Sequence, residues 1–253
     1  MAHELYNAFL IAILVLAVFT YYGTVKDLSP YGRLMKTGAN AWTLPSPAAW
    51  LMFECPQVFA FALAFWLTAD THSGVAITLF VLWQSHYLYR GILYPLRRND
   101  QGKRFPIANV VFGFLFNLMN GYTNGYAVSH AEHLLNENWF FSPWFIGGLV
   151  VALAGWLINF QADTILVNLR RDGSTGYKIP YGGFFRYVSS ANYFGEILLW
   201  CGWAAMSFTT ASIVFVIFTL SNLYPRAIIS HRWYRENFAD YPKERKAVFP
   251  FLV

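Results

Sequence analysis

The sequence predicts an all-α, multi-pass membrane protein with seven transmembrane helices. The 253-residue chain is 57% hydrophobic and only 12% charged, which leaves too little polar surface for seven helices exposed to water. Its apolar runs are each roughly 20 residues long, which at about 1.5 Å per helical residue matches a hydrocarbon core of about 30 Å. All 18 Lys and Arg residues fall in alternate gaps between these runs or in the run ends that border those gaps.

Each apolar run is expected to be a helix, because lipid offers backbone groups no hydrogen-bond partner. In chain order the runs cover residues 5–25, 47–69, 74–96, 106–128, 143–166, 189–208 and 211–231. The longest stretches between them are residues 26–46 and 167–188. No repeat, low-complexity tract or linker divides the chain, so residues 1–253 are expected to form one membrane domain.

The basic residues predict the orientation in the membrane. They follow or close the first run (Lys26, Arg33 and Lys36), the third (Arg90 to Arg104), the fifth (Arg170 to Arg186) and the seventh (Arg226 to Lys246). The opposite gaps hold Glu4, Asp70, Glu132 and Glu137 and no basic residue. By the positive-inside rule the amino terminus is outside and the carboxyl terminus is cytoplasmic.

The first run has a second reading as a cleaved signal peptide. Such a segment begins with basic residues and ends at a small-residue cleavage site, whereas here the basic residues come after the run. The net charge of +5 then reflects the inner-face loops, and nucleic acid is not an expected partner. A bacterial inner membrane and the endoplasmic reticulum both fit this integral membrane protein.

Polar side chains gather at one depth, in the cytoplasmic half of the predicted bundle. Glu54 lies roughly 10 Å from the inward end of its run and Tyr87 roughly 13 Å from the inward end of the next. Two further pairs are spaced four residues apart, which places both members on one helix face. These pairs are Asn159 with Asp163 in the fifth run and Asn192 with Glu196 in the sixth.

Each of these features also has a purely structural reading. Glu54 can bond a neighbouring helix, Tyr87 alone is an ordinary aromatic residue, and the two pairs can cap or cross-link helices. We favour a joint functional reading because ionisable groups are costly in lipid and four helices place theirs at the same depth. A cavity with Arg and Lys at its mouth would take a large anionic ligand from the cytosol and an apolar molecule from the bilayer.

Several other site classes are not indicated. The chain has no dinucleotide-binding Gly motif between strand and helix, no P-loop and no Gly-x-Ser-x-Gly. Cys55 and Cys201 both lie inside runs and indicate neither a disulfide framework nor a zinc site. His130 and His133 form a lone H-x-x-H in an outward loop, so no metal site is predicted.

The chain resembles the steroid 5-alpha-reductases along nearly its full length. In the amino half the matching residues are Ala48-Ala-Trp50, Glu54, Pro56, His86-Tyr87, Arg90 and Tyr94. In the carboxyl half they are Asn159-Phe-Gln-Ala-Asp163, Tyr177-Lys-Ile-Pro180 with Gly182-Gly183, Ala191-Asn192-Tyr-Phe-Gly195-Glu196, and His231-Arg-Trp-Tyr234 through Asp240-Tyr-Pro-Lys243 to Pro250-Phe251. One difference is Phe53, where the better-known animal members carry Gln.

The resemblance implies a reductase that uses NADPH to saturate the carbon–carbon double bond of a 3-oxo-4-ene steroid. It would work as a monomer, with steroid arriving from the bilayer and NADPH from the cytosol. Glu54 and Tyr87 would be catalytic, polarising the ketone, and Trp50, Phe53 and Phe116 would contact the steroid. The residues implied to bind NADPH are Arg90, Tyr94, Arg104, Asn159, Asp163, Arg170, Tyr177, Lys178, Asn192, Glu196, Arg226, His231 and Tyr234.

Two other functions stay open at this point. Isoprenylcysteine methyltransferases and long-chain enoyl reductases resemble the carboxyl half of the same family, although a methyltransferase has no evident need for Glu54 and Tyr87. A seven-helix sensor or carrier without chemistry is the alternative of a different class. Against it, the polar residues stop at mid-membrane and form no path to the outer face.

Overall fold

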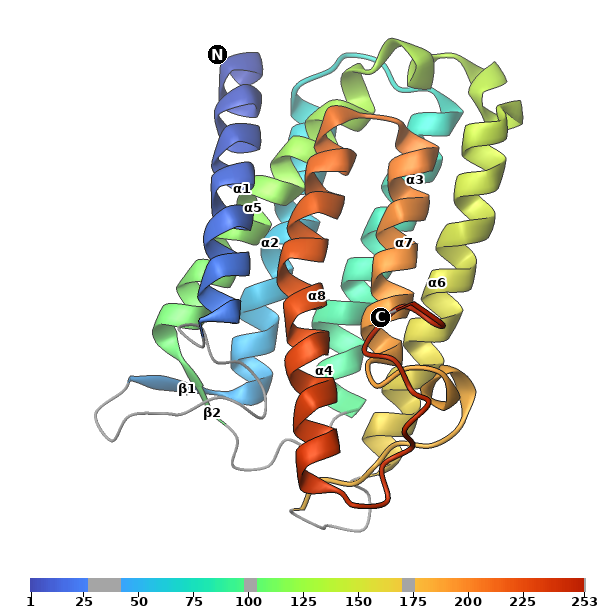
Figure 1. Cartoon of the computed structure of the whole chain (residues 1–253). Helices are drawn as coiled ribbons and strands as arrows, with labels where there is room; N and C mark the ends of the chain where they lie inside the picture. The colour runs from blue at the N-terminus through green and yellow to red at the C-terminus, as the bar shows by residue number, and fades with distance from the viewer. Residues whose placement is uncertain (27–41, 98–103, 170–175, 253) are drawn as a thin grey trace.

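The computed structural model describes residues 1–26, 42–97, 104–169 and 176–252. It is a bundle of long helices that run nearly side by side (Figure 1). The helices are α1 Ala2–Val25, α2 Ser46–Leu67, α3 Gly74–Leu88, α4 Tyr94–Arg97, α5 Ile107–His130, α6 Pro143–Asn168, α7 Ala191–Ser207 and α8 Thr210–Asn237. A π-helical turn, η2 Tyr89–Leu93, joins α3 to α4, and 3-10 turns cover η3 Glu132–Leu135, η4 Glu137–Phe141 and η5 Gly183–Arg186.

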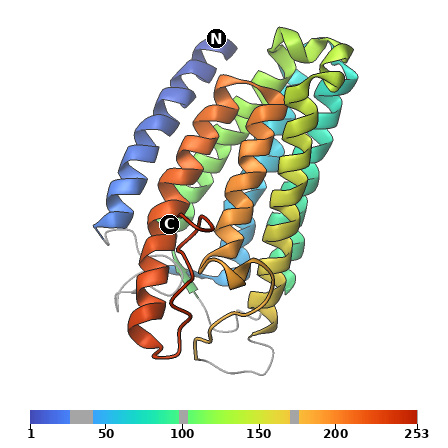
Figure 2. The same ribbon diagram turned by 45° about the vertical axis from the view of Figure 1, so that its right-hand side comes forward.

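The two ends of the bundle are built differently. The amino terminus and the turns η3 and η4 lie at one end, and a short two-stranded sheet lies at the other (Figures 1 and 2). In this sheet β1 Thr43–Pro45 pairs antiparallel with β2 Arg104–Pro106, so that Leu44 lies opposite Phe105. The sequence did not indicate these strands, because three residues are too few to show an alternating pattern.

Four helices within the described ranges are long and apolar enough to cross a membrane: α1, α2, α6 and α8. The sequence predicted seven crossings. The other three predicted runs are also helical, but they depart from that criterion for visible reasons. The third run is α-helical only as far as Leu88, where the π turn begins, and α7 has 17 residues. The fourth, α5, carries Asn117, Asn120 and Asn124, which lower its apolarity.

Helices α6 and α7 pack along one another at backbone-to-backbone distance, which places the Asn159 and Asn192 pairs side by side. Glycine makes this approach possible. A methyl group on Gly155 would lie 2.3 Å from the Leu199 backbone nitrogen, and one on Gly202 would lie 2.3 Å from the Ala152 nitrogen. Consistently, the Asn159 side chain donates a hydrogen bond to the Asn192 carbonyl, with a distance of 2.9 Å.

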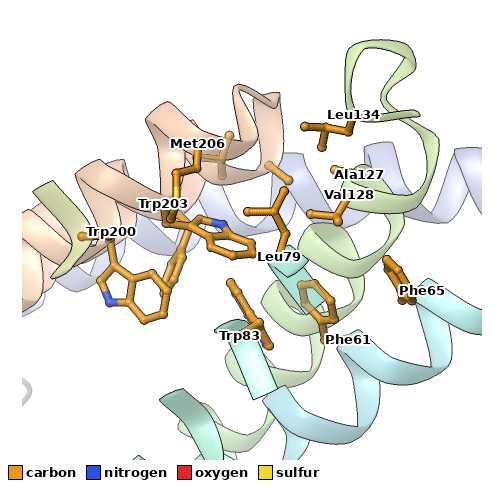
Figure 3. Packing of buried hydrophobic residues seen from close by; sticks show 14 of the residues in the cluster. Phe61, Phe65, Leu79, Trp83, Ala127, Val128, Leu134, Trp200, Trp203 and Met206 are labelled. Carbon is orange, nitrogen blue, oxygen red and sulfur yellow. The ribbon is translucent and has the colours of Figure 1, made fainter. Parts of the chain in front are cut away.

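The core is largely aromatic and is shared by residues of α2, α3, α5 and α7 (Figure 3), with Phe215 and Phe218 of α8 in the same cluster. The Trp83 ring is central: its centroid lies 4.7 Å from that of Phe61 and 4.9 Å from that of Trp203. Trp200 and Phe215 continue the cluster, with ring centroids 4.5 Å apart. Aromatic pairs at these separations add to the stabilisation from burial alone, so this cluster is a rigid support for the residues that pack against it.

The end of the bundle that carries the amino terminus is closed by residues 131–142. The Glu137 carboxylate accepts a 2.6 Å hydrogen bond from the Gly74 backbone nitrogen at the start of α3. Trp139 donates to the Met206 carbonyl, and His133 bonds to that of Ser207, at 2.7 and 2.9 Å. These contacts satisfy backbone groups that helix ends otherwise leave unpaired.

Candidate functional site

A cavity of about 700 Å³ extends from Tyr87 and Trp200 of the aromatic core toward Phe105 of the two-stranded sheet. Its walls differ in character. The aromatic and aliphatic lining residues include Phe19, Trp50, Phe53, Phe105, Phe112, Phe116, Phe215 and Phe218. The polar lining residues include Glu54, Tyr87, Arg90, Asn117, Lys178, Ser189, Asn192, Glu196, Asn222 and Arg226. The site is therefore suited to a ligand, or to two ligands, with both apolar and charged parts.

Glu54 and Tyr87 both line this cavity, as the sequence predicted. The Tyr87 side chain is 4% exposed, and its ring stacks on Trp200 with centroids 5.7 Å apart. Trp83 contacts the same ring at 4.9 Å. Packing against Trp83 and Trp200 therefore fixes the position of the Tyr87 ring.

Arg90 stands at the centre of the polar wall, on the π turn that follows Tyr87. Its guanidinium lies 3.1 Å from Asp163, 3.7 Å from Glu196 and 3.8 Å from Glu54, measured between nitrogen and carboxylate oxygen atoms. Three carboxylates from α2, α6 and α7 thus meet at one cation. π turns inside helices frequently mark functional sites, and this one sets the direction of Arg90.

Eight of the predicted cofactor residues line the cavity: Arg90, Tyr94, Tyr177, Lys178, Asn192, Glu196, Arg226 and Tyr234. Three others lie directly behind them. Asn159 bonds to Asn192, Asp163 pairs with Arg90, and the His231 ring bonds at 2.6 Å to the hydroxyl of Ser189, itself a lining residue.

One predicted cofactor residue, Arg104, lies away from the cavity. Arg104 is exposed and donates hydrogen bonds to the side chain and the carbonyl of Thr43, at 2.7 and 2.8 Å. It therefore ties β2 to β1 and is not among the lining residues. Arg170 lies outside the described residues.

The three predicted substrate residues, Trp50, Phe53 and Phe116, all line the apolar wall. Phe53 is seated on α5 at Gly113, where an added methyl group would lie 2.1 Å from the Phe53 ring. The Phe53 ring also contacts Trp50 and Phe105 edge-on, with centroids 6.1 and 6.0 Å apart. Phenylalanine at 53 and glycine at 113 thus form a matched pair.

Comparison with known proteins agrees with this geometry. Residues 103–253 match the family model described as 3-oxo-5-alpha-steroid 4-dehydrogenase. The chain is 40% identical over 252 residues to the steroid 5-alpha-reductase DET2 of Solanum lycopersicum, which covers 98% of this chain and 97% of that protein. The chain belongs to the steroid 5-alpha-reductase family.

Animal relatives match over a similar length. The 3-oxo-5-alpha-steroid 4-dehydrogenase 1 of Bos taurus is 39% identical, over 89% of this chain and 88% of that protein. The corresponding protein of Homo sapiens is 38% identical, over 88% of this chain and 86% of its own length. This family member is therefore an oxidoreductase, and its apolar helices make it an integral membrane protein.

The site of this 5-alpha-reductase family member contains residues that the sequence reading missed. Phe105 comes from a segment between the predicted runs, and Ser189, the first residue of the predicted run 189–208, lies before the start of α7 at Ala191. No periodicity places such positions in space. Phe215, Phe218 and Asn222 could have been found, since their spacing of three and four residues puts them on one face of α8 with the predicted Arg226. Asn222 accepts a 2.7 Å hydrogen bond from Arg226.

The lone H-x-x-H has structural contacts in this family member. The His130 ring stacks on Tyr126 with centroids 4.0 Å apart, and His133 bonds to the Ser207 carbonyl. No group of three or more metal-ligating side chains occurs among the described residues.

Proposed function

We propose that this protein catalyses the NADPH-dependent reduction of the 4,5 double bond of 3-oxo-4-ene steroids to 5-alpha-3-oxosteroids. The observation that carries the proposal is that Glu54 and Tyr87 line one cavity together with both aromatic and charged residues. NADPH would supply a hydride to the β carbon of the enone.

The chain's own contribution begins at the steroid ketone. Addition of hydride to the β carbon of an enone places negative charge on the ketone oxygen. A preorganised donor at that oxygen stabilises the transition state by about 3 kcal/mol. The Tyr87 hydroxyl is the proposed donor, because Trp83 and Trp200 hold its ring in the cavity wall. Glu54 lines the same cavity and either orients that hydroxyl or donates when its carboxyl is protonated.

The charged wall fits a dinucleotide phosphate. Lys178 and Arg226 line the cavity from two different segments, and their cations can neutralise phosphate oxygens. Asn192 and Tyr234 add neutral donors and acceptors that can hold ribose or carboxamide groups. The apolar wall, with Trp50, Phe53 and Phe116, would pack against the rings of the steroid.

The proposal extends to the membrane. We place the amino terminus outside and the end of the bundle that carries β1 and β2 in the cytosol. All seven predicted runs then cross the bilayer in one domain of 253 residues. The shorter helices α3 and α7 would cross as part of the bundle. In a bacterial inner membrane or in the endoplasmic reticulum, steroid would then enter from lipid and NADPH from the cytosol, and one chain would hold the complete site.

The test uses the full-length protein in lipid nanodiscs with a 3-oxo-4-ene steroid and NADPH deuterated at the transferable position. We expect the enone absorbance to fall and mass spectrometry to find one deuterium at carbon 5 of a 5-alpha product. If the protein reduces other enones but not the steroid, the proposed substrate is wrong and the reaction type stands. Product without deuterium would refute the hydride step.

A further inference from the structure

Arg90 is surrounded by charged and aromatic groups from α2, α4, α6 and α7. Besides its three carboxylates, it has Trp50 and Tyr94 on its faces, with ring centroids 5.3 and 4.7 Å from the guanidinium carbon. Its side chain is 16% exposed. A guanidinium with this many partners is not available to a phosphate, so its role differs from that of Lys178 and Arg226.

The cluster of Arg90, Glu54, Asp163 and Glu196 has an unbalanced charge. Three carboxylates against one guanidinium give a net charge of −2, or −1 when Glu54 carries a proton. The side chains of Asp163, Glu54 and Glu196 are 1%, 14% and 23% exposed. Water therefore screens this charge poorly, and its field reaches the cavity that Glu54, Arg90 and Glu196 line.

The geometry also keeps the cluster in place. Gly91, next to Arg90 on the π turn, lies against Glu54, and an added methyl group there would be 3.0 Å from the Glu54 β carbon. Asp163 accepts a direct hydrogen bond from Arg90 at 3.1 Å. Since preorganised charges need no reorganisation when charge develops nearby, a fixed negative cluster can act on a reacting group.

The proposed reaction creates a positive charge that matches this cluster. Hydride transfer moves one hydrogen nucleus and two electrons to the enone. It leaves one positive charge on the nicotinamide ring and one negative charge on the enolate oxygen. A proton from water then adds to the α carbon and converts the enolate to the saturated ketone. A net negative cluster at the cavity wall therefore favours the oxidised ring over the reduced one.

We propose that the Arg90 cluster makes this site bind oxidised dinucleotide in preference to reduced dinucleotide. The proposal rests on the proposed function, because it takes the nicotinamide ring to lie beside the cluster. Arg90 is a positioning residue in it: it holds the three carboxylates together without cancelling their charge.

The experiment compares the binding of NADP⁺ and NADPH to the full-length protein in nanodiscs by isothermal titration calorimetry, without steroid. The variant is Glu196→Gln, which removes one negative charge and keeps the shape of the side chain. One elementary charge at about 10 Å, with an effective dielectric constant of about 20, changes a binding constant by about tenfold. We therefore expect the preference for NADP⁺ over NADPH to fall by about tenfold.

Asn192→Ala is the matched control, because Asn192 lies one turn away on α7 and lines the same cavity without a charge. This variant should weaken the binding of NADP⁺ and of NADPH by the same factor. Arg90→Gln should shift the preference in the direction opposite to Glu196→Gln, provided that the variant keeps the wild-type melting temperature. The test with Glu196→Gln is valid whether or not Arg90→Gln keeps that melting temperature.

The outcomes separate this inference from the proposed function. If wild-type protein binds neither dinucleotide, the proposed function fails. If it binds both, and Glu196→Gln weakens both equally, Glu196 acts only as a neutral contact and the charge inference is refuted while the reductase proposal stands.

Discussion

The glycine seam between α6 and α7 gives a sharp test of the packing, since neighbouring glycines on α6 differ in what they touch. A methyl group on Gly148 would lie 2.6 Å from the Met206 nitrogen and 2.7 Å from the Gly202 oxygen. A methyl group on Gly147 would meet nothing within 4 Å. Gly148→Ala and Gly147→Ala therefore make the same chemical change one residue apart, with opposite surroundings.

The magnitude follows from the clash. Restoring an ordinary contact from 2.6 Å to 3.4 Å requires the helices to separate by about 0.8 Å, because the atoms in the way are backbone atoms. Overpacking of this kind costs about 1 to 3 kcal/mol, and a gap of that width also forfeits a quarter to a half of the neighbouring dispersion contacts. At the upper end, and at about 2 to 4 °C per kcal/mol, the melting temperature falls by about 6 to 12 °C.

The assay is thermal unfolding followed by tryptophan fluorescence, with both variants in the same nanodiscs and at one heating rate, since membrane proteins unfold irreversibly and the midpoint depends on the rate. Gly147→Ala should unfold at or slightly above the wild-type temperature, because alanine is the better helix former. Equal melting temperatures for the two variants would refute the close approach of α6 and α7.

Three further predictions follow. Tyr87→Phe and Glu54→Gln should each lower kcat by about 100-fold, while the Kd for NADPH measured by calorimetry stays within about twofold; wild-type turnover in either would remove that residue from the proposed mechanism. Burial lowers the pKa of His72 from its ordinary 6.5, and nearby His130 lowers it further, so the folded protein resists protonation there. The melting temperature should therefore fall as the pH is lowered from about 7 toward 5, and the part of that fall absent from His72→Gln measures this residue; parallel curves would contradict the assignment. Glu137→Gln should lower the melting temperature by about 3 °C through the weakened cap on α3, and an unchanged value would show that the cap contributes nothing.

The helices were largely predictable because hydropathy reports directly on burial in lipid. The predicted run 143–166 became α6 at Pro143–Asn168, and 106–128 became α5 at Ile107–His130. The last run ended too early, at 231, whereas α8 continues to Asn237. Hydropathy marks where a helix leaves the apolar layer, and the following polar residues remain helical beyond it.

The site was predictable in its parts and not in its contacts. Counting residues from the inward ends placed Glu54 and Tyr87 at one depth, and both line the cavity. The sequence predicted Arg90 only as a cofactor contact, while the structure surrounds it with three carboxylates. That arrangement depends on a π turn and on the rotation of three helices, neither of which leaves a periodic signal in the sequence.

The seating of Phe53 on Gly113 constrains how this chain can diverge from its animal relatives. A side chain at 113 would overlap the phenyl ring as it lies, so that ring would have to shift before a larger residue could enter. Substitutions at 53 and 113 should therefore be coupled. A library that randomises position 113 alone should favour glycine, and one that also varies position 53 should accept more residues there.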